Sequence, residues 1–201
     1  MIEFLIRRFV PDWQQVQRTD VRERYGTLAA VVGILSNIFL CIIKGLTGLF
    51  SGSIAVTADA VNNLSDAGSS VITLLAFKIA GKPADEEHPY GHARMEYISG
   101  MAVSFIIILL GLELMGSSFE KILHPEEVGV SALTYLVLIV SIAVKLWQGM
   151  FNRSLGKRIS SEALQATAAD SLNDVFSTGA VLLSTLVYQF TAIPIDGWVG
   201  M

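Results

Sequence analysis

The chain is poor in charge and in cysteine. Only 16% of its 201 residues are Asp, Glu, Lys or Arg, against about 25% in soluble domains. The 14 basic residues are outnumbered by 18 acidic ones, and the resulting net charge of −4 gives no argument for nucleic-acid binding. A single cysteine, Cys41, excludes both a disulfide framework and a paired-cysteine metal or redox motif.

Apolar residues are abundant instead. They make up 52% of the chain, and the mean hydropathy is +0.56. A membrane-spanning helix needs roughly 20 mostly apolar residues, and five stretches meet that length: 26–50, 53–80, 98–119, 132–151 and 162–189. The sequence therefore predicts an all-α, polytopic membrane helix bundle with five transmembrane helices. The predicted membrane domain is 25–201, preceded by an N-terminal segment, 1–24.

The distribution of Lys and Arg predicts the orientation of these helices. Basic residues gather in the N-terminal segment and beside the second and fourth connections, whereas the other connections are neutral or acidic. Positive loops stay on the cytoplasmic side, so we expect a cell-membrane protein with a cytoplasmic N-terminus. Within the first segment, residues 4–10 form either an amphipathic surface helix or a disordered leader. Residues 194–201 have the pattern of a turn that enters another apolar segment. We expect a chain truncated at the start of a sixth helix, and a genuine short tail is the alternative.

Two of the predicted helices carry polar residues at matching spacing. Asn62 and Asp66 are four residues apart, as are Asp170 and Asp174. Residues four apart lie on one helix face, and acids inside a membrane usually face a cavity or a partner. Asp59, three residues before Asn62, is either a supporting acid or a helix-end residue near the outer interface, and the second reading is favoured. One isolated pair could be neutral and hydrogen-bonded, but two matched pairs favour a cation site.

The donor atoms at these positions are all oxygens. One amide and three carboxylates suit hard cations such as Mg2+, Ca2+ and Mn2+, whereas Zn2+ usually recruits His or Cys. A second candidate site lies in the connection after the second predicted helix, where the spacing of an acid and two imidazoles also permits a metal. Its residues are Asp85, His88 and His92, although polar loops often carry such residues without a metal.

Four ordered motifs make the chain similar to a known family. "SGSIAVTADAVNNLSDAGSS", "DEEHPYGHARMEYI", "FEKILHPEEV" and "DSLNDVFST" together resemble the cation diffusion facilitator family of divalent-metal/proton antiporters. The resemblance implies six membrane helices, a cytoplasmic C-terminal metal-binding domain and a homodimer. It also implies a transport site at Asn62, Asp66, Asp170 and Asp174, and a secondary metal site at Asp85, His88 and His92. His124 matches no family ligand and is expected to be a solvated loop residue.

The resemblance also implies a substrate. Zinc-transporting members typically have His at the position of Asp170, so this pattern resembles the manganese-type branch. We therefore expect efflux of divalent cations by proton-coupled alternating access, with Mn2+ favoured, Zn2+, Fe2+, Co2+ and Cd2+ as other cargoes, and no prosthetic group. A Zn2+ or Fe2+ transporter of the same family is the main alternative, and a passive cation channel a weaker one. An enzyme is not expected, because the chain has no His-Glu-x-x-His motif and no nucleophile beside a base at credible spacing.

Overall fold

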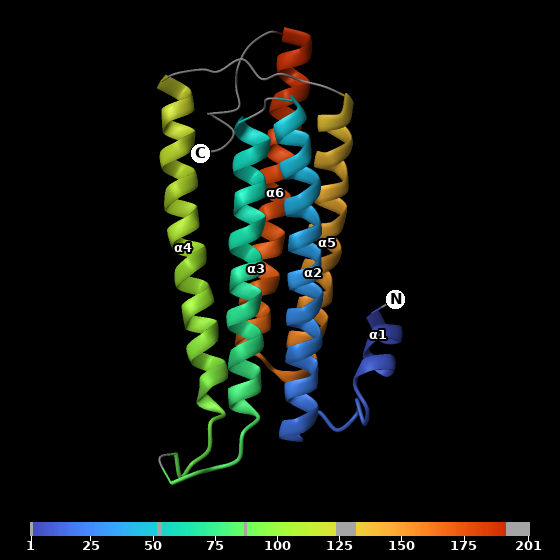
Figure 1. Cartoon of the computed structure of the whole chain (residues 1–201), viewed down its shortest axis with the longest axis vertical. Coiled ribbons are helices and arrows are strands. Elements are labelled where there is room, and N and C mark those ends of the chain that lie inside the picture. The colour runs from blue at the N-terminus through green and yellow to red at the C-terminus, as the bar shows by residue number, and fades with distance from the viewer. Residues whose placement is uncertain (1, 52–53, 87, 124–131, 192–201) are drawn as a thin grey trace.

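The computed structural model describes residues 2–51, 54–86, 88–123 and 132–191, and six helices make up nearly all of them (Figure 1). No strand occurs within these ranges, which confirms the predicted all-α class. The helices are α1 (Ile2–Phe9), α2 (Thr19–Ser51), α3 (Ile54–Ala80), α4 (Arg94–Leu123), α5 (Ala132–Ile159) and α6 (Glu162–Thr191).

Each of the five long helices coincides with one predicted span, and all except α3 extend beyond it. The largest differences are α2, which begins at Thr19 rather than at 26, and α5, which continues to Ile159 rather than ending at 151. Helices of about 30 residues are about 45 Å long, enough to cross the hydrocarbon core of a bilayer, which is about 30 Å thick. The predicted turn at 194–201 and His124 lie outside the described residues.

Three described helices are both long and apolar enough to cross a membrane by length and composition: Thr19–Phe50 in α2, Arg94–Glu113 in α4 and Ala132–Ile159 in α5. The sequence predicted five spans. The other two, α3 and α6, have the length of a span but are less uniformly apolar, because they carry the polar pairs of the predicted site. Such helices are stable in a membrane only when their polar faces are turned away from lipid.

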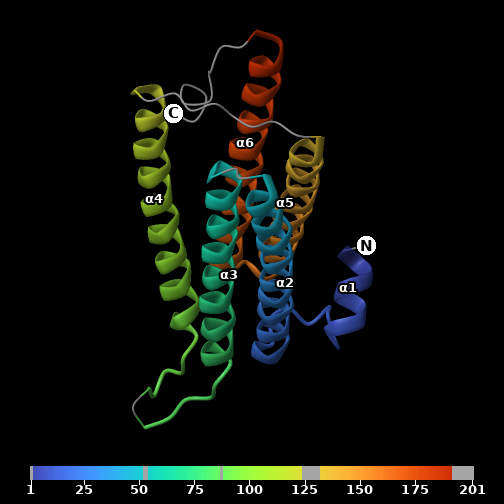
Figure 2. The ribbon, with the colours of Figure 1, turned by 45° about the horizontal axis from the view of Figure 1, so that its top comes forward.

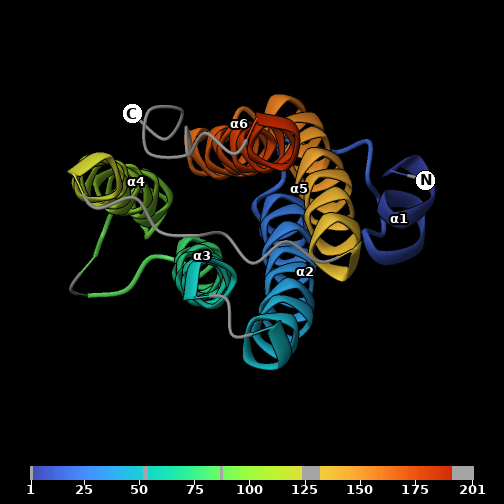
Figure 3. The ribbon, with the colours of Figure 1, turned by 90° about the horizontal axis from the view of Figure 1, so that it is seen from above.

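The helices pack so that these polar faces meet inside the bundle. Viewed from above, α2 lies between α3 and α5, and α6 lies on the opposite side of the bundle between α5 and α4 (Figure 3). The helices α3 and α6 also contact each other directly. The most extensive packing of α6 is against α5, where a Cβ atom on Gly149 would come within 3.4 Å of the carbonyl oxygen of Ala168.

One end of the bundle is tightly packed. At this end, called the α1 end because α1 lies beside it, α2 begins at Thr19 and α5 ends at Ile159 (Figure 1). Arg22 donates to both carboxylate oxygens of Glu96, at 2.9 and 3.1 Å, and to the carbonyl of Ile159, which joins α2, α4 and α5. Gly100 of α4 lies so close to α6 that a Cβ atom there would come within 3.2 Å of the backbone of Ala163.

At the opposite end, α4 lies farther from its neighbours. From the α1 end onward, α4 diverges from α3 and α6 (Figure 2). Val103 is fully buried, but large apolar side chains further along α4, such as Phe105, Ile108 and Leu112, are exposed. Exposed apolar side chains on a membrane helix face lipid or a partner protein.

The N-terminal segment is helical and packed, so the disordered alternative for residues 4–10 is wrong. Ile6 and Val10 are fully buried in one core cluster with Tyr25 of α2 and Leu155 of α5. Arg158 of α5 donates to Glu3, and this hydrogen bond holds the pKa of the Glu3 carboxyl below its usual value. The apolar face of α1 therefore rests on the bundle, while Phe4 and Phe9 are exposed.

Candidate metal centre

The predicted ligand pairs on α3 and α6 lie in one place. Carboxylate oxygens of Asp66, Asp170 and Asp174 all lie within 4.8 Å of one another, and these three residues are called the carboxylate cluster below. Asp66 comes from α3, whereas Asp170 and Asp174 are one turn apart on α6. Asp66 is buried and the other two are half-buried.

The spacing of these oxygens fits a hard divalent cation. No two of these oxygens are more than 4.8 Å apart, so small side-chain movements would bring all three to the distance of about 2.0–2.6 Å at which Mg2+ and Ca2+ bind oxygen ligands. Neighbouring carboxylates repel one another unless positive charge lies between them. The cluster can therefore attract and hold a divalent cation.

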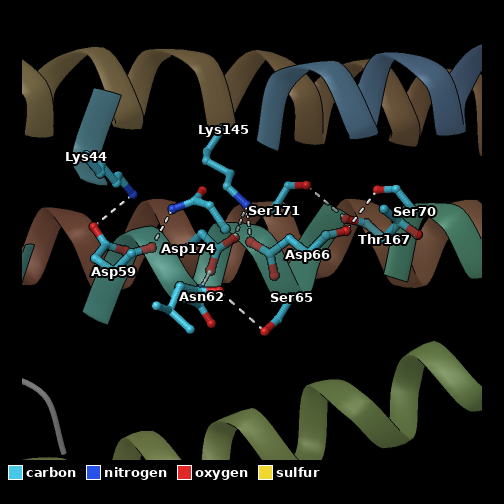
Figure 4. Close-up of polar contacts among 12 residues, drawn as sticks. Lys44, Asp59, Asn62, Ser65, Asp66, Ser70, Lys145, Thr167, Ser171 and Asp174 are labelled. Carbon is cyan, nitrogen blue, oxygen red and sulfur yellow. Dashed lines mark hydrogen bonds and ion pairs between the residues drawn. The ribbon is translucent and has the colours of Figure 1, made fainter. Parts of the chain in front are cut away.

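Asn62 lies at the edge of the carboxylate cluster. Its Nδ2 donates to Oδ1 of Asp174 at 3.5 Å, which joins α3 to α6 (Figure 4). A half-turn of the amide group would present Oδ1 to the cluster in place of Nδ2, and a neutral oxygen is a suitable ligand for a hard cation. All four predicted residues are thus brought together.

Lys145 of α5 also belongs to the site, although it was not predicted from the sequence. Its ammonium group lies 2.6 Å from Oδ2 of Asp66 and 2.5 Å from Oδ2 of Asp174, between the two helices that carry the predicted ligands (Figure 4). Its side chain is only 3% exposed. A charged lysine in the middle of an apolar membrane helix costs stability unless it is paired with an acid. The sequence could therefore have indicated that Lys145 pairs with the predicted carboxylates.

A second buried lysine pairs with the remaining acid of α3. Lys44 of α2 is 2% exposed, and its ammonium group lies 2.8 Å from Oδ2 of Asp59 (Figure 4). Asp59 lies in the second turn of α3 and also accepts, through its backbone carbonyl, a hydrogen bond from Asn63 at 2.7 Å. Asp59 therefore stabilises the α2–α3 contact and is not a member of the carboxylate cluster.

Buried amides continue the polar interior along α5. Gln148 and Asn152 follow Lys145 on the buried face of this helix, and both are almost completely buried. Oε1 of Gln148 and both side-chain polar atoms of Asn152 have no hydrogen-bond partner among the described residues. Buried polar atoms in such positions usually bind water, so the interior between the cluster and the α1 end is polar.

The second candidate site also assembles. Asp85, His88 and His92, called the loop triad below, offer ligand atoms within 4.8 Å of one another. Oδ1 of Asp85 lies 3.2 Å from Nδ1 of His88, and Oδ2 lies 3.4 Å from Nε2 of His92. The backbone N–H of His88 also donates to Asp85 at 2.7 Å, and this bond is the main cause of a pKa below the usual value for the Asp85 carboxyl.

Comparison with known protein families shows which family the chain belongs to. Residues 30–201 match the model of the cation efflux transmembrane domain. The chain belongs to the cation efflux family. It is therefore a multi-pass membrane protein, and the predicted resemblance to the cation diffusion facilitators is confirmed.

Curated relatives support the same assignment. This cation efflux domain is 34% identical over 179 residues to the manganese efflux system protein MneS of Bacillus subtilis, covering 87% of this chain and 62% of MneS. It is 33% identical over 160 residues to the uncharacterized transporter MJ0449 of Methanocaldococcus jannaschii, covering 80% of this chain and 56% of the relative. The magnetosome protein MamB of Magnetospirillum gryphiswaldense is 30% identical over 151 residues, 75% of this chain and 51% of MamB. The chain thus spans between half and two thirds of the length of these relatives.

Proposed function

We propose that this cation efflux domain exports Mn2+ in exchange for protons, and that Asn62, Asp66, Asp170 and Asp174 hold the cation. The observation that carries the proposal is the carboxylate cluster, whose oxygens lie within 4.8 Å of one another inside a bundle of apolar helices. A membrane protein retains such a cluster of acids at a considerable cost in stability, about 2.5–3.5 kcal/mol or more for each charge near the bilayer centre.

The choice of Mn2+ rests on the donor atoms. Carboxylate and amide oxygens suit Mn2+, and none of the four residues offers the imidazole or thiolate that Zn2+ usually recruits. A relative that is 34% identical is named as a manganese efflux protein. Zn2+ and Fe2+, and after them Co2+ and Cd2+, are the alternative cargoes.

The mechanism we propose is alternating access. Arg22, Glu96 and the end of α5 close the α1 end of the bundle, while α4 diverges at the other end (Figure 2). We place the α1 end in the cytoplasm, because the N-terminal segment is rich in arginine. Residues 1–24 then form the cytoplasmic segment and residues 25–201 the membrane domain. In this arrangement the described conformation is closed toward the cytoplasm, and opening of the Arg22–Glu96 contact admits the next cation.

Protons complete the proposed cycle. Protons that enter from outside compete with the cation for Asp66, Asp170 and Asp174, so that the cation is released and the protons travel inward. We expect the protein to work as a homodimer in the lipid bilayer, and the exposed apolar side chains of α4 are available for lipid or for the second copy.

Flux measurements with and without a proton gradient test this function. We expect purified protein in proteoliposomes to accumulate Mn2+ against its gradient when a proton gradient is imposed, and to lose that ability when an ionophore collapses the gradient. If the exchange of Mn2+ for protons moves net charge, the membrane potential also affects the Mn2+ flux. The membrane potential is therefore clamped during the measurement. Mn2+ movement that only follows its own gradient would contradict antiport and support the channel alternative.

The loop triad is expected to tune transport rather than to perform it. The double variant His88→Ala, His92→Ala removes two of its three side chains and leaves all four residues of the membrane site in place. We expect maximal Mn2+ flux to stay near that of the unmodified protein, with at most an approximately tenfold rise in the Mn2+ concentration for half-maximal flux, the lower end of the effect of losing a supporting residue. Complete loss of flux in a folded double variant would make the loop triad an obligatory part of the pathway.

A further inference from the structure

We propose that Lys145 is an internal counter-cation: its ammonium group occupies the carboxylate cluster when no metal is bound, and the transported cation must displace it. This inference rests on the proposed function, because it assigns a role to a residue within the same site. It makes Lys145 a residue that sets the affinity and the charge selectivity of the site.

The geometry places the ammonium group where the cation would bind. Its Nζ bridges Asp66 of α3 and Asp174 of α6 at 2.6 and 2.5 Å. Among the described residues it forms no ion pair with Asp170, so one carboxylate of the cluster remains available to a first contact with the metal. The ammonium group is buried with its partners, so solvent screens the pairs little.

The ammonium group and a divalent cation cannot hold the same oxygens at the same time. A metal bound to Asp66 and Asp174 would approach their oxygens to about 2.0–2.6 Å, and at such short range it would strongly repel a second positive charge. The long, flexible stem of lysine allows the group to move away. Gln148, three residues further along the same buried face of α5, offers a buried Oε1 that has no partner among the described residues and can accept the displaced ammonium.

The charges at the site favour a divalent cargo. With the carboxylates of Asp66, Asp170 and Asp174 ionised and Lys145 protonated, the carboxylate cluster and Lys145 together carry a charge of −2, wherever in the interior the ammonium group lies. One divalent cation brings the sum to zero, whereas a monovalent or trivalent cation leaves a net charge inside the bundle. Lys145 also weakens the hold of the three carboxylates on the metal, which favours release on the far side of the membrane.

The chain offers a matched control for this role. Lys44 is also buried, is also paired with an aspartate from α3, and lies in a neighbouring helix away from the carboxylate cluster (Figure 4). A variant at Lys44 therefore reports the general effect of losing a buried positive charge. Only a variant at Lys145 removes a charge that contacts Asp66 and Asp174.

The test is Mn2+ binding and Mn2+ flux by four forms of the purified protein in lipid nanodiscs and proteoliposomes: unmodified, Lys145→Met, Lys145→Gln and Lys44→Met. We expect both Lys145 variants to bind Mn2+ at least about tenfold more tightly, because a like charge has been removed from beside the metal. They should also turn over more slowly, since release is harder. Lys44→Met should keep the Mn2+ affinity of the unmodified protein.

The other possible results contradict either the role of Lys145 or the proposed function. Equal or weaker Mn2+ affinity in a folded Lys145 variant, or tighter binding to the same extent in Lys44→Met, overturns the counter-cation role. Lys145→Gln keeps a polar group between the two carboxylates, so it replaces Lys145→Met if the methionine variant does not fold without metal. Failure of the unmodified protein to bind Mn2+ would instead overturn the proposed function, which separates the two conclusions.

Discussion

Asp174→Ala is expected to abolish Mn2+ transport while the protein still inserts into the membrane. Asp174 contacts both Asn62 and Lys145 and belongs to the carboxylate cluster, so its loss removes one predicted ligand and disturbs the arrangement of two neighbours. Loss of a residue that merely supports a metal ligand typically lowers affinity 10- to 100-fold. Removal of a carboxylate that binds the metal directly should therefore lower the flux at limiting Mn2+ about 100-fold or more.

The adjacent residue provides the control for this variant. Asn173 lies next to Asp174 in α6, but its side chain is exposed on another face of the helix. Asn173→Ala should insert and transport Mn2+ like the unmodified protein. Flux through a well-inserted Asp174→Ala protein at the rate of Asn173→Ala would remove Asp174 from the site.

Asp170→His should shift the selectivity from Mn2+ toward Zn2+. The substitution exchanges a hard oxygen donor for an imidazole nitrogen, a ligand that Zn2+ favours. Asp170 is half-buried and forms no ion pair with Lys145 among the described residues, so the contacts of Lys145 with Asp66 and Asp174 remain. We expect the Zn2+-to-Mn2+ flux ratio to rise about tenfold, which corresponds to about 1.4 kcal/mol.

Parallel Zn2+ and Mn2+ uptake into vesicles measures this ratio. Glu162→His is the matched control, because it places the same side chain on the same helix at an exposed position at the start of α6. The control should leave the ratio unchanged. An unchanged ratio in an inserted, active Asp170→His protein would mean that this position does not set selectivity, and the choice of Mn2+ would lose its main physical support.

Residues four apart in a helix could be predicted to share a face from the sequence alone. The pairs Asn62 with Asp66 and Asp170 with Asp174 are fixed locally by helix geometry, and their polarity inside apolar stretches predicted that the two faces would meet. The loop triad was predictable because its three residues are close together in the chain. Helix boundaries were less predictable, as the early start of α2 and the late end of α5 show.

The role of Lys145 could not be predicted in the same way. Its position opposite Asp66 and Asp174 depends on which helices are neighbours and on how α5 is rotated about its axis, and neither follows from a local pattern. The same reason explains why the pairing of Lys44 with Asp59 was missed. The packing of α1 against the bundle depends on a core cluster that contains both Ile6 and residues far along the chain, such as Leu155.

The most direct test of the account is the location of Mn2+ in an experimental structure of the protein, determined with anomalous scattering from crystals grown with Mn2+. We expect a Mn2+ peak between α3 and α6 with oxygens of Asp66, Asp170 and Asp174 at roughly 2.0–2.6 Å, the distance range of hard divalent cations. We also expect the ammonium group of Lys145 to have moved away from Asp66 and Asp174. A Mn2+ peak at the loop triad alone, with Lys145 still bridging the two aspartates, would contradict it.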